Sequence, residues 1–193
     1  MSSRLRPAPV LWIVSGPSGS GKTSLCQALL KSRPWAGKLL RSVSYTTRLL
    51  RPGELEGRDY RRIPEKKFLE LKRRKAFLET ERIFGAYYGT PKKIIADARR
   101  QGKDILLCID VKGARTVRRQ LKGKAVSIFI ATPKLGDLTR RLRKRSTENK
   151  KDIQKRLRRV KMEFSCAKTY DHVVVNDRFA RALGELKEIL ASK

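Results

Sequence analysis

The segment from Gly16 to Thr23 has the residue types and the spacing needed to hold a chain of phosphates. It reads Gly-Pro-Ser-Gly-Ser-Gly-Lys-Thr, a full match to the pattern Gly-x-x-x-x-Gly-Lys-Ser/Thr. Glycines let consecutive backbone N–H groups curl around a phosphate, and the helix expected next adds the positive end of its dipole. Lys22 supplies a charge for the β- and γ-phosphates, and Thr23 supplies a hydroxyl ligand for Mg²⁺. The segment predicts binding of a nucleoside triphosphate with magnesium; the alternative is a tight strand-to-helix turn without a ligand.

A second anion site is indicated by Arg48 and Arg51, which lie close together in a segment rich in turn-forming residues. Two guanidinium groups so placed can direct their N–H forks at one phosphate. The phenols of Tyr60 and Tyr88 offer further hydrogen-bond donors. For any single arginine in so basic a chain the alternative is a solvated surface charge, which is what we expect of Arg58 or Arg61.

Glu79 lies in an apolar, strand-like segment, where a carboxylate requires a partner. Guanine supplies one, because its N1–H and N2–H₂ are adjacent donors that match a bidentate carboxylate. The hydroxyls of Ser44 and Thr90 are candidate donors to guanine O6. Asp110, at the end of another apolar strand, has two interpretations that both stay open. It is a carboxylate on the magnesium side of the site or the N-cap of the following helix.

Short apolar runs alternate with amphipathic segments, which is typical of a parallel sheet covered by helices on both faces. The expected strands are Val10–Ser15, Leu39–Tyr45, Phe77–Phe84, Asp104–Asp110, Ala125–Ala131 and His172–Val175. The expected helices are Lys22–Lys31, Pro64–Arg74, Pro91–Gln101, Lys112–Leu121, Lys134–Lys144, Asp152–Ala167 and Arg178–Leu190. Residues 46–90 interrupt the alternation and predict an insertion at the functional edge of the sheet.

The composition limits the class of protein. A net charge of +30 on 193 residues indicates either nucleic-acid binding or a basic protein with anionic substrates. No nucleic-acid-reading motif is present, so we expect no specific nucleic-acid partner and at most nonspecific polyanion binding at low salt. No apolar run is long enough to span a bilayer, and the three cysteines are widely spaced. We therefore expect a cytoplasmic protein of one domain, with no membrane partner and with free thiols.

Together these segments resemble the guanylate kinase family, enzymes that phosphorylate GMP with ATP. The resemblance extends from about Val10 to Leu190 and rests on several separate motifs in the family's order. They are Ser15–Lys22, Ser42–Arg48 continued by Arg51–Glu54, Gly57–Tyr60, Tyr87–Thr90, Ile109–Gly113 and Val174–Asp177.

The resemblance implies an α/β fold of the P-loop nucleoside-monophosphate-kinase type. A parallel-sheet core (about 9–43, 94–133 and 169–193) has helices on both faces and carries a GMP-binding lobe (about 44–93) and a lid (about 134–168), all within one domain, 1–193. The implied substrates are ATP with Mg²⁺, and GMP, with dGMP a further candidate acceptor. Protein partners stay unassigned.

The resemblance also implies roles for individual residues. The ATP contacts are Gly16, Pro17, Ser18, Gly19, Ser20, Gly21, Lys22, Thr23, Ser24 and Asn176, with Thr23 on the metal. The GMP contacts are Ser44, Arg48, Arg51, Tyr60, Glu79, Tyr88, Thr90 and Asp110. The catalytic cations are Lys22, Arg48, Arg141, Arg145 and Arg156, of which Arg141 and Arg145 match arginines of the family's lid.

The chain departs from the family pattern in three places. Cys108 stands where many members carry an acidic residue that helps to hold guanine. In the lid, Ser146 replaces a usual glycine, and Lys150 and Lys151 replace common acidic residues. Two other functions are less well supported. A non-catalytic scaffold module of this family usually has a degraded phosphate loop, whereas the loop here is intact. A kinase of the same fold that acts on a sugar phosphate is disfavoured by the Ser44, Glu79 and Tyr88–Thr90 set, because a sugar phosphate has no guanine edge to read.

Overall fold

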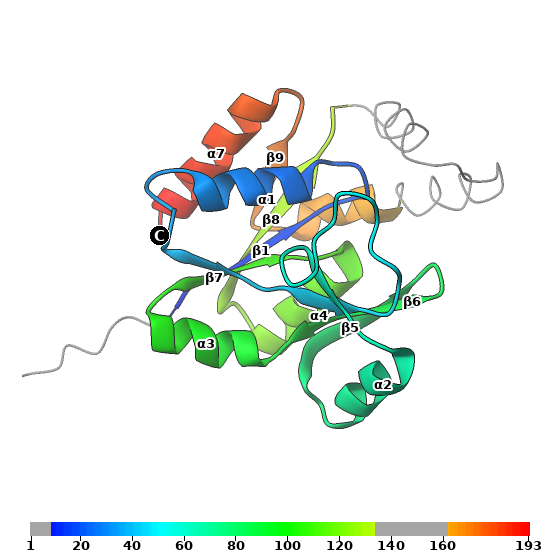
Figure 1. The fold of residues 1–193 in the computed structure, drawn as a ribbon. Coiled ribbons are helices and arrows are strands. Elements are labelled where there is room, and N and C mark those ends of the chain that lie inside the picture. The colour runs from blue at the N-terminus through cyan, green and yellow to red at the C-terminus, as the bar shows by residue number, and fades with distance from the viewer. Residues whose placement is uncertain (1–8, 134–161) are drawn as a thin grey trace, which may run out of the picture.

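The computed structural model describes residues 9–133 and 162–193 (Figure 1). In this part of the chain, five strands form the main sheet in the order β2-β7-β1-β8-β9. They are β1 (Leu11–Ser15), β2 (Leu39–Arg41), β7 (Asp104–Cys108), β8 (Ala125–Ala131) and β9 (His172–Val175). All the pairings are parallel, so the carboxyl ends of the strands lie along one edge of the sheet. This edge is where ligands bind in open α/β sheets.

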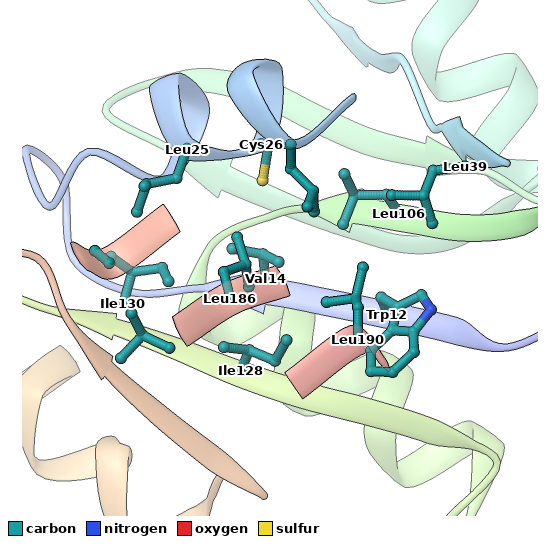
Figure 2. Packing of buried hydrophobic residues seen from close by; sticks show 13 residues of the cluster. Trp12, Val14, Leu25, Cys26, Leu39, Leu106, Ile128, Ile130, Leu186 and Leu190 are labelled. Atoms are coloured by element: carbon teal, nitrogen blue, oxygen red, sulfur yellow. The ribbon is translucent and has the colours of Figure 1, made fainter. Parts of the chain in front are cut away.

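Helices cover both faces of this sheet because its strands are apolar on both sides (Figure 1). On one face, α1 (Lys22–Lys31) and α7 (Phe179–Ala191) pack against Trp12 and Val14 of β1. Figure 2 shows Val14, Leu25 and Leu186 meeting between these elements. On the other face, α3 (Lys93–Gln101) and α4 (Val111–Leu121) pack against Leu11 and Ile13. Such two-sided burial explains the continuous hydrophobic run in β1.

A second, four-stranded sheet has the order β4-β3-β6-β5. Its strands are β3 (Ser44–Thr46), β4 (Tyr60–Arg62), β5 (Phe77–Ile83) and β6 (Ala86–Pro91), and α2 (Glu65–Arg73) packs on it. The ring of Phe68 on α2 stacks on Phe77 and Tyr87, at centroid distances of 4.8 and 5.3 Å. Strand β5 packs against α4, which fixes this sheet beside the functional edge of the main one. The predicted insertion is therefore a small sheet with its own aromatic core.

One expected strand is wrong, and two strands, β4 and β6, were not expected. The single strand expected at Leu39–Tyr45 is two strands in different sheets, because β2 pairs with β7 whereas β3 pairs with β4 and β6. Apolar patterning does not reveal such a change of partner. The patterning also does not predict a strand at Ala86–Pro91, although β6 forms a hairpin with β5 there. Its Gly-Thr-Pro ending hides the strand, since glycine and proline are rare in strand interiors.

The other expected elements of the described chain agree with the structure to within two residues. The helices expected at Lys134–Lys144 and over most of Asp152–Ala167 lie outside the described residues. Residues 162–165 are helical, and a short 3₁₀ helix, η1 (Cys166–Thr169), follows them. Among the described helices, none combines the length and the hydrophobicity needed to cross a bilayer.

Candidate active site

The phosphate loop connects the end of β1 to the start of α1 and depends on two glycines. Gly16 and Gly21 have φ values of 143° and 90°, which residues with a side chain rarely adopt. A Cβ on Gly16 would lie 2.3 Å from the carbonyl oxygen of Ile130, and one on Gly21 would lie 2.3 Å from Nδ2 of Asn176. The backbone of the loop is therefore packed directly against β8 and the segment after β9. A side chain at position 16 would require β8 to move, and one at position 21 would displace the Asn176 side chain.

The loop residues that can meet a triphosphate lie where the motif predicts. The Lys22 Nζ donates to the carbonyl oxygen of Pro17 at 3.1 Å, which bends the lysine back over the loop. Thr23 and Ser24, in the first turn of α1, expose their side chains. Because this helix begins at Lys22, the positive end of its dipole faces the same space. The arrangement can bind a chain of phosphates.

Asn176 lies against the phosphate loop, just after β9. Its side chain is only 6% exposed, and Nδ2 donates to the carbonyl oxygen of Ser20 at 2.7 Å. The backbone N–H of Asn176 donates to Ala131 at the end of β8. Asn176 therefore holds the phosphate loop against the sheet, and contact with adenine stays a prediction.

Three side chains expected at the guanine base lie together at the junction of β3, β5 and β6. The Thr90 hydroxyl donates to Oε1 of Glu79 at 2.5 Å, and it lies 3.5 Å from the hydroxyl of Ser44. Glu79 is 6% exposed and forms no ion pair with any described residue. The pairing of β5 with β6 explains the contact, because Glu79 and Thr90 are register partners. These groups present a carboxylate and two hydroxyls to one point.

Burial raises the pKa of Glu79 to about 7, and the nearby carboxylates of Asp110 and Glu81 act in the same direction. The hydrogen bond from Thr90 opposes the rise and only partly offsets it. Asp110 itself caps α4, since its Oδ1 accepts from the backbone N–H of Gly113 at 2.7 Å. The capping interpretation of Asp110 is thus confirmed, and its contact with GMP stays a prediction. A ligand that donates two N–H groups to Glu79 would relieve the cost of this buried carboxylate.

Gly113 is a site residue that the motif contained but to which no role was assigned. A Cβ at this position would lie 2.9 Å from Oε2 of Glu79. The first turn of α4 can therefore approach the carboxylate only because residue 113 has no side chain. The signal in the sequence was a glycine in the first turn of an otherwise good helix, which costs helix stability and requires a reason.

Arg48 is held in place by several partners. Its Nε donates to the Tyr88 hydroxyl at 2.9 Å, one terminal nitrogen donates to Oε1 of Glu54 at 2.7 Å, and its guanidinium lies 5.1 Å from the ring centroid of Tyr60. The Tyr60 and Tyr88 rings meet edge to face at 5.9 Å. Burial raises the pKa of Tyr60 to about 12, so its phenol remains a donor at neutral pH. The cluster presents a fixed cation with donors around it.

Glu54 is a second site residue to which the sequence motifs give no role. One of its oxygens accepts from the Arg48 side chain, and the other accepts from the backbone N–H of Arg51 at 2.8 Å. Burial opposes ionisation of Glu54, but the hydrogen bonds from Arg48 and Arg51 outweigh burial and lower its pKa. The Arg51 guanidinium is exposed and has no hydrogen-bond or ion-pair partner among the described residues. The structure thus orients Arg48 and leaves Arg51 free to meet a ligand.

The structure places Cys108 on the phosphate-loop side of the site. The thiol of Cys26, on α1, donates a hydrogen bond to Cys108, and Thr23 lies within hydrogen-bonding reach. The hydrogen bond from Cys26 and the charges of Lys22 and Arg41 lower the pKa of Cys108. Cys108 thus lies beside the phosphate loop, with Tyr60 of the second anion site also within electrostatic range, whereas Asp110 is the acidic neighbour of Glu79.

The chemistry of the donors near Thr23 fits a hard divalent cation. Mg²⁺ prefers oxygen ligands and is usually held by one or two protein groups together with phosphates and water. The exposed Thr23 hydroxyl at the start of α1 is such a group. The remaining predicted site residues, Arg141, Arg145 and Arg156, lie outside the described residues.

A phosphate loop lies at the carboxyl edge of a parallel sheet covered by helices on both faces, and a second anion site lies in the small sheet beside that edge. This combination defines a kinase of the P-loop class. The family model described as guanylate kinase matches residues 9–193. The chain belongs to the guanylate kinase family, which confirms the resemblance, the fold class and the kinase activity expected from the sequence.

Similar proteins support this assignment. A guanylate kinase of Photorhabdus laumondii is 43% identical over 183 residues, covering 95% of this chain and 87% of that protein. A guanylate kinase of Maricaulis maris is 42% identical over 198 residues, covering 98% and 89%. The crystal structure of guanylate kinase from Anaplasma phagocytophilum superposes with a TM-score of 0.78 at 31% identity, covering 98% of this chain and 88% of that one.

Proposed function

We propose that this chain transfers the γ-phosphoryl group of ATP to GMP, giving ADP and GDP. The observation that carries the proposal is the buried Glu79 carboxylate, hydrogen-bonded to Thr90 and without a cationic partner among the described residues. The N1–H and N2–H₂ groups of guanine would provide the two donors that this carboxylate lacks. Adenine, cytosine and uracil do not present two adjacent N–H donors of this kind.

The residues of the second sheet position the acceptor phosphate. Arg48 is held by Glu54 and Tyr88, so it meets the phosphate of GMP without first losing conformational entropy. Tyr60 and the exposed Arg51 would add donors to the same phosphate. The attacking oxygen is already anionic, so the reaction needs no general base. The task of the protein is to hold two anions in line and to offset their repulsion.

The phosphate loop positions the donor. Backbone N–H groups between Gly16 and Thr23 and the Lys22 ammonium would neutralise the β- and γ-phosphates. Bound beside Thr23, Mg²⁺ would withdraw charge from the phosphate oxygens. By resemblance alone, we assign Arg141, Arg145 and Arg156 to the charge that develops on the transferring group. The three cysteines are free thiols, which supports a cytoplasmic site of action.

The test is ADP formation from ATP and Mg²⁺ with GMP, dGMP, AMP, CMP or UMP as the acceptor, at physiological ionic strength. We expect turnover with GMP, a measurable rate with dGMP, and none with the other three. The variant Glu79→Gln should discriminate less well in favour of GMP. Its matched control is Glu65→Gln, which changes an exposed carboxylate on α2. Equal turnover with GMP and AMP by the unaltered protein would reject the assignment of Glu79.

A further inference from the structure

The edge of the main sheet opposite the active site carries a group of cations that the kinase reaction does not use. Lys38, Lys103 and Lys124 directly precede β2, β7 and β8, so all three lie at the amino edge. The register confirms this, because Leu39 pairs with Asp104, and Leu11 pairs with both Ile105 and Ala125. The phosphate loop follows β1 and Asp110 follows β7, so both lie at the opposite, carboxyl edge. The two edges are about 15–20 Å apart, given about 3.3 Å per strand residue.

The last turns of two helices add cations at the same edge. Helices α3 and α4 share one face of the sheet and end where β7 and β8 are about to begin (Figure 1). Arg99 lies in the last turn of α3, Arg119 lies in that of α4, and Lys122 is the C-cap of α4. Six cations, called here the amino-edge patch, therefore share this end of the molecule: Lys38, Arg99, Lys103, Arg119, Lys122 and Lys124.

The charges of the amino-edge patch are not neutralised within the described part of the chain. None of its six side chains forms an ion pair or a side-chain hydrogen bond with a described residue. Two carboxylates, Asp97 and Asp104, belong to the same elements, and both interact with groups outside the patch. Asp97 pairs with Arg100 at 2.7 Å, and Asp104 accepts from the backbone N–H of Val10 and the indole of Trp12. Cations at helix ends also complement helix dipoles, but Lys38 and Lys124 precede strands and have no such role.

The patch fits the phosphate backbone of a nucleic-acid duplex. Along the sheet order β2-β7-β1-β8, its three lysines span about 14 Å, given about 4.8 Å between strands. A duplex presents about eight phosphates over that length, at one charge per about 1.7 Å. Within the described ranges 9–133 and 162–193, no large hydrophobic side chain is exposed in the patch. The exposed ones there are Leu49, Leu55, Leu69, Phe84, Met162, Val173 and Phe179. Base stacking on a single strand and insertion into a membrane both require such side chains.

We propose that the amino-edge patch binds duplex nucleic acid through its phosphates, without sequence preference, while the kinase site on the opposite edge remains accessible. This surface gives part of the +30 net charge a function separate from catalysis. Binding by this patch also differs from diffuse attraction to the net charge, because it depends on a defined group of side chains.

The test measures binding of a labelled duplex of about 16 base pairs, as RNA and as DNA, by fluorescence anisotropy between about 50 and 300 mM KCl. The patch variant is Lys38→Gln/Lys103→Gln/Lys124→Gln. The control variant, Lys66→Gln/Arg73→Gln/Lys168→Gln, removes the same number of charges from exposed positions elsewhere. ADP formation and thermal unfolding show that each variant is folded. A second patch variant, Arg99→Gln/Arg119→Gln/Lys122→Gln, replaces the first if that one fails to fold.

We expect the patch variant to bind at least tenfold more weakly at about 100 mM KCl, and its log–log salt slope to be shallower by about two to three. The control variant should bind like the unaltered protein, and all the variants should keep their ADP-forming activity. Comparison of the two duplexes shows whether RNA or DNA is preferred. Equal losses in the patch and control variants would overturn the proposal in favour of diffuse net charge. Patch-dependent binding to phosphatidylserine vesicles without duplex binding would overturn it in favour of a membrane.

Discussion

Replacing Glu79 by glutamine should stabilise the free protein at high pH while it damages recognition of guanine. The carboxyl of Glu79 is buried, and burial raises its pKa from an ordinary value near 4.5 to about 7. The unfolded chain therefore releases this proton at a lower pH than the folded protein does. As pH rises from about 4.5 to about 7, the folded state loses stability relative to the unfolded state, and above pH 7 the loss is complete.

The size of the effect follows from the two pKa values. One pKa unit corresponds to 1.36 kcal/mol, so the shift costs on the order of 3 kcal/mol of unfolding free energy at pH 8. Glutamine has nearly the same shape, can still accept the hydrogen bond from Thr90, and carries no charge beside Asp110. We expect Glu79→Gln to match the unaltered protein at pH 4.5 and to be more stable by on the order of 3 kcal/mol at pH 8.

The assay is urea unfolding without nucleotides at pH 4.5, 6 and 8, with Glu65→Gln as the control for loss of one exposed carboxylate. The same Glu79→Gln protein should lose about 100-fold in kcat/KM for GMP, because a charge-assisted pair of hydrogen bonds is removed. The cost assigned to burying the Glu79 carboxylate would be refuted if the unaltered protein and Glu79→Gln lost stability equally as pH rises. It would also be refuted if Glu79→Gln were the less stable of the two at pH 8. Unchanged guanine preference would refute the assigned recognition.

Three other substitutions test separate parts of the site. Glu54→Gln should raise the KM for GMP about fivefold and leave the KM for ATP unchanged, because a largely buried pair with Arg48 holds that arginine in place; equal effects on both substrates in steady-state kinetics would contradict this. Asn176→Ala should cost about 1–3 kcal/mol in urea unfolding and raise the KM for ATP rather than GMP, since the Ser20 carbonyl loses its buried donor. Gly113→Ala should raise the KM for GMP and lower the free energy of unfolding by about 1–3 kcal/mol, because the added Cβ would lie 2.9 Å from Oε2 of Glu79. Unchanged GMP binding by calorimetry would show that α4 can move aside.

Features that depend on local chemistry could be read from the sequence. The phosphate loop is one: its glycines, its lysine and the helix that follows act within a few residues of one another, so the motif carries the geometry. The apolar runs of β1, β7 and β8 are equally plain, because strands buried on both faces have no alternation to obscure them. The importance of the buried carboxylate Glu79 was also predictable, since a charge in an apolar strand requires a partner.

Features that depend on which segments meet could not be read in this way. The chain from Leu39 to Thr46 changes sheets, and apolar patterning along one strand does not specify its neighbours. Glu54 is an ordinary acidic residue in a turn until the fold brings Arg48 against it. The pKa of Glu79, the packing of Asn176 beneath the loop and the thiol contact between Cys26 and Cys108 likewise depend on burial and distance across the fold.

The class of chemistry follows from the residues alone, because phosphate binding and guanine recognition need particular functional groups at particular spacings. How those groups are held, and how much stability their burial costs, depends on the fold. Only the fold shows that Arg48 is already oriented, that Asp110 caps α4, and that six cations meet at the edge of the sheet opposite the site. The physical reason is that hydrogen bonds, burial and charge act over a few ångströms in space, whatever the separation along the chain.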